Sequence, residues 1–286
     1  MIKNGLNPPA SGGSNLRLVA LLLAAASARA VAQSPTIELL DPSFRADAAI
    51  EKEAREPGAP RFRAAVGAGF GVTPRFEGSD HYRPRIAPAV HLAYGPVFFG
   101  IGGLGVNLYR DPRWRFGASL SLGRGRKESD DQRLQGLGDV DRTVVAGLFA
   151  VYSGRAVLAR AHVTSDIGGK GQGTVVRLDA FGRFSGGERL AFFAGPGLTW
   201  ADRRHMQTFF GVSADQAARS GLPEFTANAG VDSLRVSAGA AYRAAPRWRV
   251  VGIYSLARLQ GDAAASPIIE TRTQNSFFVS AIYLLR

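Results

Sequence analysis

Apolar residues alternate with small or polar residues along one unbroken stretch, from Trp114 to Gly123. Every second position carries an apolar side chain, whereas Arg115 and a series of serines and glycines occupy the positions between them. In a β-strand, successive side chains point to opposite faces of the sheet. The pattern therefore predicts a strand with one apolar face and one small or polar face.

The same alternation recurs in three other segments, at residues 64–72, 190–200 and 234–243. In the last of these, the polar face carries Arg235 and Arg243 beside serine and glycine, which suits a wet interior better than a packed one. The apolar faces are therefore expected to point outward into lipid. An open sheet would leave the hydrogen bonds of its edges unmet in lipid, so the sheet is expected to close on itself.

Strand-like segments fill the chain from Arg63 onward. Eleven are recognised, at 63–72, 84–94, 97–109, 113–123, 143–152, 156–165, 174–184, 189–201, 233–243, 247–259 and 274–285. A bacterial single-chain barrel has an even number of strands, so one strand between residues 63 and 109 is miscounted. We therefore predict an all-β fold, an antiparallel transmembrane β-barrel of 10 or 12 strands.

The connections between these segments differ in length in a regular way. Counted back from a periplasmic C-terminus, short periplasmic turns fall at 110–112, 153–155, 185–188 and 244–246. The alternate connections are long outer loops, at 124–142, 166–173, 202–232 and 260–273. Two of the short turns share the sequence Pro-Arg-Trp-Arg, which places Trp114 and Trp248 at the periplasmic membrane interface, where amphipathic rings are favoured.

The N-terminus has the features of a secretory signal peptide. Lys3 and Arg17 precede an apolar run at 18–26, and small residues flank a plausible cleavage position before Gln33. The run is too short to cross a membrane, and no later segment offers the roughly 20 apolar residues of a spanning helix. The chain is accordingly divided into a signal peptide at 1–32, a periplasmic tail and linker at 33–62, and a barrel at 63–286.

Composition and charge narrow the function. The absence of cysteine excludes disulfides, thiol chemistry and a lipoprotein anchor. The net charge is +12, but the basic residues are spread singly, so nucleic acid is not expected as a partner. The inward-facing positions instead predict lumen charges, namely Arg115, Arg177, Asp179, Arg183, Arg235 and Arg249. They either line a pore or pair with acids, and Asp179 lies between Arg177 and Arg183 on one face.

Motifs for cofactor or metal chemistry are weak. Residues 100–105 fit the spacing G-x-G-x-x-G, but a strand and a turn follow instead of the helix that a dinucleotide site requires, so no cofactor is expected. The four histidines show no ligand spacing, which predicts no metal site. His81 and His205 lie beside loops rich in serine and aspartate, so a lipid hydrolase is kept as an alternative, although no G-x-S-x-G motif accompanies them.

The outer loop 124–142 is rich in charged residues. It carries five basic and five acidic side chains, so its net charge is zero. This balance predicts a solvated loop, held in part by internal salt bridges, rather than a ligand site.

The outer loop 202–232 holds the most distinctive sequence of the chain. Two phenylalanines precede Gly211, and Ser213 then opens a polar stretch that closes at Ser220 and Gly221, which predicts a short helix capped by Ser213. With a Ser-Pro segment in the next outer loop, these motifs resemble the MipA/OmpV family of outer-membrane proteins. The matching positions are Phe209, Phe210, Gly211, Val212, Ser213, Ser220, Gly221, Leu222, Ser266 and Pro267.

The resemblance runs from about Arg63 to the C-terminus. It implies a non-enzymatic barrel in the outer membrane of a Gram-negative bacterium, surrounded by outer-membrane lipid. It also implies a scaffold that links a murein transglycosylase to a murein synthase. A narrow porin-like channel for small solutes is the alternative, and an outer-membrane lipid hydrolase is the second. One departure is the C-terminus, where Leu285 and Arg286 replace the aromatic residue at which such barrels usually end.

Overall fold

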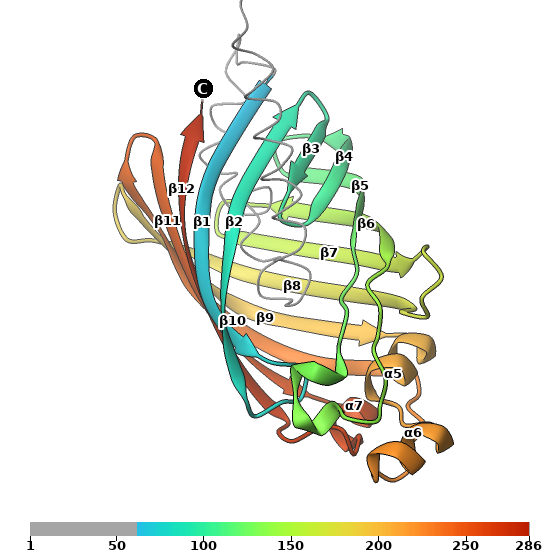
Figure 1. The fold of residues 1–286 in the computed structure, drawn as a ribbon. Coiled ribbons are helices and arrows are strands. Elements are labelled where there is room, and N and C mark those ends of the chain that lie inside the picture. The colour runs from blue at the N-terminus through green and yellow to red at the C-terminus, as the bar shows by residue number, and fades with distance from the viewer. Residues whose placement is uncertain (1–61, 286) are drawn as a thin grey trace, which may run out of the picture.

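The computed structural model describes residues 62–285 and shows a closed antiparallel barrel of twelve strands (Figure 1). Each strand pairs with the next along the chain, and β1 pairs with β12 to close the sheet. The strands are β1 (Phe62–Pro74), β2 (Tyr82–Tyr94), β3 (Val97–Gly100), β4 (Gly103–Arg110), β5 (Trp114–Leu122), β6 (Val144–Ser153), β7 (Val157–Asp166), β8 (Thr174–Ser185), β9 (Leu190–Ala201), β10 (Gly230–Ala245), β11 (Trp248–Leu259) and β12 (Thr273–Leu285). The predicted all-β barrel is therefore confirmed, with 12 strands.

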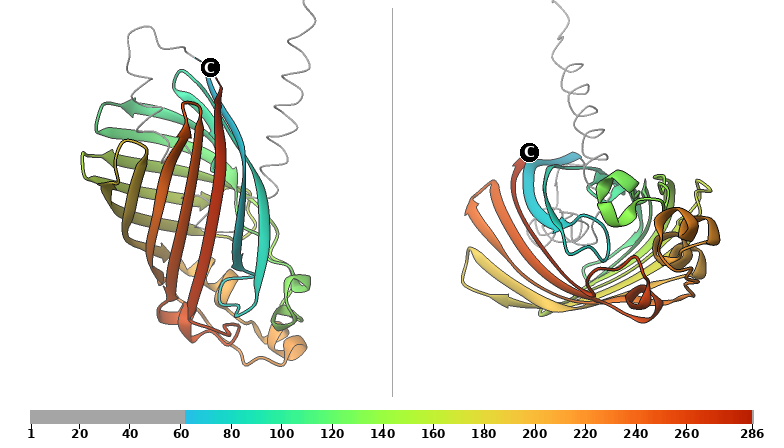
Figure 2. Two further views of the ribbon diagram at one scale, coloured as in Figure 1. Left: turned by 90° about the vertical axis from the view of Figure 1, so that its left-hand side faces the viewer. Right: turned by 60° about the horizontal axis from the view of Figure 1, so that its bottom comes forward.

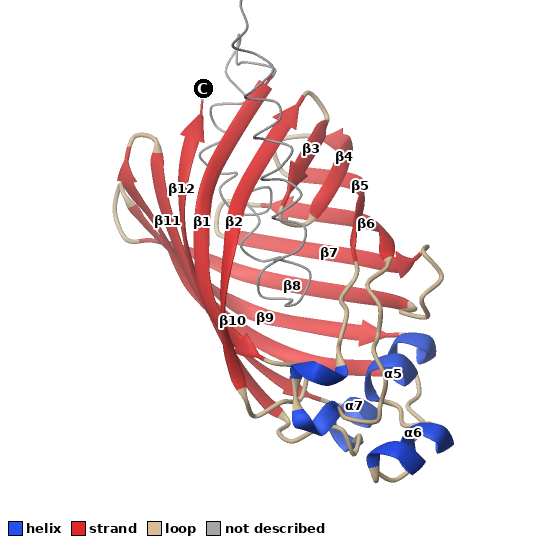
Figure 3. Ribbon diagram, viewed as in Figure 1, coloured by secondary structure: helices blue, strands red, loops and turns tan. Residues whose placement is uncertain are grey.

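Helices gather at one end of the barrel, opposite the end at which the C-terminal strand finishes (Figure 3). They are η1 (Glu128–Asp130), η2 (Gln132–Leu134), α5 (Arg203–Phe210), α6 (Ala214–Ser220) and α7 (Gly261–Ala265). We call this end the loop end and the opposite one the turn end. In the described part of the chain, no helix is long and apolar enough to cross a membrane.

The missing twelfth strand lies inside the segment predicted as a single strand at 97–109. That prediction was wrong, because the chain reverses between Gly100 and Gly103 to form the hairpin β3–β4. Gly103 has a φ of +102°, which a residue with a side chain rarely adopts. The G-x-G-x-x-G spacing is thus the signature of this hairpin turn, and no helix follows it.

The short β3 leaves most of β2 with a partner on one side only. β2 pairs with β1 along its whole length, but with β3 only at residues 92–94. Tyr94 pairs with Val97 across a two-residue turn, so the N–H groups of even-numbered β2 residues point toward the β3 side. Pro84 and Pro88 are even-numbered and have no backbone N–H. The hydrogen-bond donor that each lacks would face the unpaired side, where proline is tolerated.

The outer surface of the wall is apolar and aromatic, as the alternation predicts for a surface in lipid. On β5, Trp114, Phe116 and Leu120 are 40–46% exposed, whereas Arg115 between them is 7% exposed. At the turn end, Trp114 packs against Tyr152 at 4.9 Å between ring centroids, and Trp248 against Tyr283 at 5.2 Å. Both tryptophans therefore lie where an aromatic girdle is expected.

Glycines on the inner face make room for aromatic rings. A Cβ added to Gly71, Gly105, Gly117 or Gly239 would lie within 2.4 Å of a phenylalanine ring on a neighbouring strand. The rings are those of Phe278, Phe98, Phe149 and Phe193, respectively. A substituted side chain would displace these rings, so the glycine-rich inner face is a packing requirement of a narrow barrel.

The predicted signal peptide lies outside the described residues. The same holds for the predicted tail, except that Phe62, assigned to its end, opens β1.

Candidate functional site

Three charged side chains meet on the inner face of the wall. The Asp179 carboxylate accepts hydrogen bonds of 3.1 and 2.6 Å from the Arg160 guanidinium and another from Arg235. All three side chains are at most 4% exposed. Arg235 reaches over β9 because Gly197 lies between β8 and β10 and carries no side chain there. We call this group the lumen ion triplet.

The partners of Asp179 come from β7 and β10 rather than from its own strand. Arg235 is one of the predicted lumen charges, whereas Arg160 is not among them. Arg177 is buried on the same face, and the Arg183 guanidinium donates to the Gly154 carbonyl. Arg115 lies with its guanidinium carbon 5.9 Å from the centre of the Phe149 ring.

Arginine side chains gather around a cavity at the turn end, and we call this group the basic rim. Arg183 and Arg249 belong to it. Arg249 donates to the carbonyls of residues 245, 246 and 248. The rim encloses a cavity of about 410 Å³ with an apolar floor that includes Phe181, Phe193 and Val251. Five arginines line it, namely Arg155, Arg183, Arg189, Arg243 and Arg249, beside a single acid, Glu188.

The family-like motif of loop 202–229 builds the core of a cap at the loop end (Figure 2). α5 begins at Asp202, whose carboxylate accepts from the His205 backbone N–H at 2.8 Å. It ends in Phe209 and Phe210, which are 8% and 0% exposed and pack with Met206 and neighbouring apolar residues. The pair of phenylalanines therefore anchors the loop over the barrel.

Side chains from two other loops bind the main chain of this motif. Arg126 donates to the Phe209 carbonyl at 2.7 Å, and Ser266 Oγ donates to the Phe210 carbonyl at 2.6 Å. Arg133 donates to the carbonyls of Pro267 and Ile268. Burial lowers the pKa of Arg126 to about 10, which still leaves it charged at neutral pH. These contacts thus join three loops of the cap into one assembly.

The second half of the motif forms α6, as predicted. Ser213 is its N-cap and, with Gln216, makes a reciprocal capping box. Gly221 ends the helix with a φ of +73°. Val212 pairs with Phe225 in an isolated bridge, while Leu222 packs beside Val212 in an apolar cluster of the cap.

The loop 123–143 is solvated only in part, because Lys127, Asp139 and Asp141 are exposed while two other charged side chains are buried. Arg126 and Asp131 are each 5% exposed, and the ion pairs cross to another loop or strand. Arg124 pairs with Glu77 at 2.8 Å, and Asp130 pairs with Arg83 at 2.9 Å. A balance of opposite charges does not reveal where the partners lie, which is why the prediction missed these pairs.

His205 lies beneath the cap and is 4% exposed. Its Nδ1 is 2.8 Å from the Gln172 carbonyl oxygen and so acts as a donor. Burial, with a smaller effect from Arg124, lowers the pKa of His205 to about 4, so the ring is neutral at pH 7. Within residues 62–285, no serine hydroxyl is hydrogen-bonded to the ring of His205 or His81.

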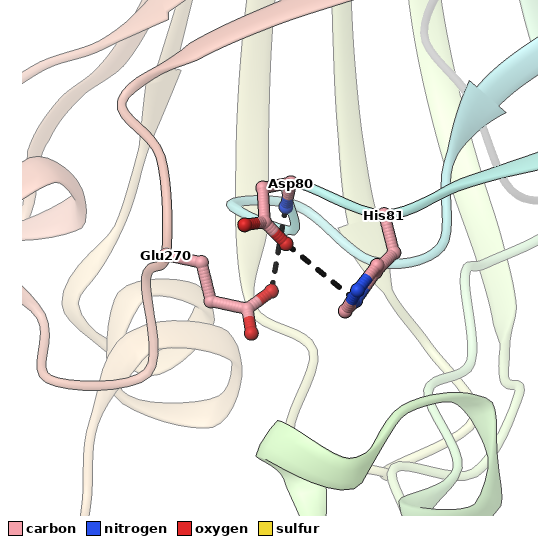
Figure 4. A group of neighbouring side chains, drawn as sticks. All are labelled: Asp80, His81 and Glu270. Atoms are coloured by element: carbon pink, nitrogen blue, oxygen red, sulfur yellow. Dashed lines mark hydrogen bonds and ion pairs between the residues drawn. The ribbon is translucent and has the colours of Figure 1, made fainter.

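A third group lies on the exposed surface of the loop end (Figure 4). The ligand atoms of Asp80, His81 and Glu270 all lie within 4.8 Å of one another. His81 Nδ1 is 3.5 Å from Asp80 Oδ1 and 3.3 Å from Asp131 Oδ2. The prediction of no metal site considered only local spacing, and Glu270 is 189 residues away from His81 in the sequence.

Three residues of these groups were missed by sequence reasoning. Arg160 lies two residues from both Leu158 and His162 on β7, so all three share one face of the strand. The alternation along the strand could therefore have predicted that Arg160 points inward. Arg126 and Glu270 had no such signal, because their roles depend on contacts between loops. Only the folded barrel brings those loops together.

A model of the family described as "MltA-interacting protein MipA" matches residues 66–285. Proteins named MltA-interacting protein from Escherichia coli (strain K12) and Shigella flexneri are each 27% identical over 146 residues, which is 50% of this chain and 57% of the relative. The aligned region thus spans little more than half the length of these relatives.

Two solved barrels are also similar. The NanC porin has 10% identity and a TM-score of 0.40, and the match covers 78% of this chain and 100% of that chain. The KdgM porin has 7% identity and a TM-score of 0.39, with 78% and 99% covered.

Proposed function

Because the chain belongs to the family of the MltA-interacting protein MipA, we propose that it is a non-enzymatic scaffold in the outer membrane of a Gram-negative bacterium. It holds a murein transglycosylase, the kind of partner for which the relatives are named, and with it a murein synthase. The barrel is embedded in outer-membrane lipid through its apolar and aromatic surface.

The basic rim at the turn end is the observation that carries this proposal. Short turns and a C-terminal strand that finishes at the same end are typical of the periplasmic side of such barrels. A partner that acts on murein works in the periplasm and so meets this end. The rim offers it positive side chains around a cavity of about 410 Å³, and Arg155, Arg189 and Arg243 among them are exposed.

A pull-down with matched charge reversals tests the proposal. The bait is the full chain in detergent, and the partner is the soluble form of the host's murein transglycosylase. We expect Arg155→Glu with Arg189→Glu to weaken binding at least about tenfold, and more at low salt. The control, Arg203→Glu with Arg204→Glu, reverses two exposed arginines at the loop end and leaves binding unchanged. Equal binding by both variants, or no binding by the unmodified chain, contradicts the proposal.

The narrow pore remains the second candidate because the lumen face carries arginines. The inner face of the barrel, however, is filled by aromatic rings that pack against glycines and by the lumen ion triplet. A contiguous apolar cluster joins inward residues of β2, β8, β11 and β12, including Ala87, Phe181, Ile253 and Phe278. We therefore expect a silent barrel in planar bilayers, and stable single-channel steps would favour the pore.

The hydrolase alternative is the weakest of the three. His205 uses its Nδ1 proton on a backbone carbonyl, and the His81 ring lies beside carboxylates rather than a hydroxyl. Nucleophilic catalysis by serine needs the serine within hydrogen-bonding reach of a base. Equal lipid turnover by the unmodified chain and by His81→Ala or His205→Ala would eliminate this function.

A further inference from the structure

We propose that Asp80, His81 and Glu270 form a binding site for a divalent first-row transition metal ion, with Zn²⁺ as the best match. Figure 4 shows the three residues, which are exposed. They belong to connections at the loop end, whereas the basic rim lies at the turn end. The site is independent of the scaffold function, so either can fail without the other.

Closure of the barrel assembles the site. Asp80 and His81 belong to the loop between β1 and β2, and Glu270 belongs to the loop between β11 and β12. These loops are neighbours because β1 pairs with β12. Backbone N–H groups of Glu270 and Thr271 donate to the Gly78 carbonyl at 2.9 and 3.0 Å, which fixes one loop against the other.

Polar contacts then orient the Glu270 carboxylate. Its Oε2 accepts from Ser79 Oγ at 3.2 Å and from the Asp80 backbone N–H at 3.3 Å. Ser79 is fully buried and Glu270 is exposed, so this hydrogen bond is partly shielded from solvent. A carboxylate that is already held in position loses less entropy when it binds an ion.

The separations of His81 Nδ1 from the neighbouring carboxylates are compatible with a shared metal ion. Hydrogen bonds from a ring N–H to oxygen are usually 2.7–3.2 Å long. His81 Nδ1 is 3.5 Å from Asp80 Oδ1 and 3.3 Å from Asp131 Oδ2. In a tetrahedral zinc site with bonds of about 2.1 Å, two ligand atoms are about 3.4 Å apart. The distances from His81 to Asp80 and to Asp131 lie on either side of that value. The Glu270 ligand atom lies within 4.8 Å of those of Asp80 and His81, so these exposed side chains close in when the ion binds.

The donor set also points to the class of ion. One imidazole with two carboxylates suits zinc and its neighbours, whereas calcium and magnesium prefer oxygen ligands alone. Asp131 can supply a further carboxylate oxygen, and its side chain is 2% exposed. Arg75 competes for Asp131 at 3.5 Å, but its side chain is 44% exposed and free to turn into solvent.

Isothermal titration of the full chain in detergent tests this site. The protein is treated with chelator, carries no histidine tag, and is titrated with ZnCl₂, then with CaCl₂ and MgCl₂. We expect one zinc site and at least tenfold weaker binding of the other two ions. His81→Ala and Glu270→Gln each weaken zinc binding at least tenfold. Asp215→Asn, which removes an exposed carboxylate of α6 at the same end, leaves it unchanged.

Three results would overturn the proposal. They are the absence of a saturable zinc site, equal zinc affinity in His81→Ala, and equal affinity for zinc and calcium. The unfolding midpoint of each variant in urea, measured without metal, shows that the barrel is intact. Glu270→Asp provides a second route, because it keeps a carboxylate and is expected to retain part of the affinity that Glu270→Gln loses.

Discussion

The wall and the cap of this barrel are stabilised in different ways. In the wall, main-chain pairing runs through twelve strands, and the side chains need only be apolar outside and small or polar inside. In the cap, irregular main chain is held by particular side chains, such as Arg126 on the Phe209 carbonyl and Ser266 on the Phe210 carbonyl. Many sequences meet the requirements for forming the wall, whereas few meet those for forming the cap. This explains why the family-like motif lies in the loops.

The largest effect is expected in the wall, at the lumen ion triplet. Asp179→Ala removes the buried carboxylate that Arg160 and Arg235 share, which destabilises the barrel by about 3–5 kcal/mol. The free energy of unfolding is measured by urea titration with tryptophan fluorescence. Asp215→Asn, at an exposed position of the cap, is the matched control and changes it by less than about 0.5 kcal/mol. Similar values for both variants would show that the triplet does not stabilise the wall.

A pH-dependent effect is expected in the cap, at His205. Its pKa is lowered to about 4 in the folded cap, so between about pH 6.5 and 4 the unfolded loop binds a proton that the folded cap does not. Stability of the cap therefore falls as the pH is lowered through this range, by at most about 3 kcal/mol. Hydrogen exchange of α5 measures the opening of the cap.

His205→Asn separates this titration from the others. The amide keeps a donor for the Gln172 carbonyl but does not titrate, so the loss of protection on acidification should be smaller than in the unmodified chain. An identical pH profile would mean that His205 is not the group responsible.

A smaller and local effect is expected at Ser266. Ser266→Ala removes the donor to the buried Phe210 carbonyl, which destabilises the cap by about 1–2 kcal/mol. Limited proteolysis of loop 202–229 should accelerate, while the urea midpoint of the wall stays the same. Ser185→Ala, at an exposed serine of the turn end, serves as the control. A shift in the wall midpoint would show that cap and wall unfold together.

The smallest effect is expected at the N-cap of α6. Ser213→Ala removes one half of the capping box and destabilises this helix by about 1 kcal/mol. Ser213→Asp keeps an acceptor and restores most of the loss. Hydrogen exchange of the α6 amides is the readout, and equal exchange in all three proteins would mean that the box adds nothing.

The contrast between wall and cap also determines how much of the structure could be predicted from the sequence. The alternation predicts the closed barrel and the outward tryptophans, because strand direction follows from a period of two. It misses the hairpin β3–β4, because four residues are too few to show a period and glycines hide the turn. In the loops, the Ser213 cap is local and predictable. Helix α5, the buried Arg126 and the Glu270 cluster depend on contacts between distant segments and are not.

A gel-mobility measurement on the cell fractions tests the membrane barrel most directly. The outer-membrane and periplasmic fractions are separated, and the chain is run on a denaturing gel both unheated and boiled. We expect the chain in the outer-membrane fraction and a change in its mobility on boiling, because a closed barrel resists detergent until it is heated. A chain found in the periplasmic fraction, with the same mobility before and after boiling, would contradict this expectation.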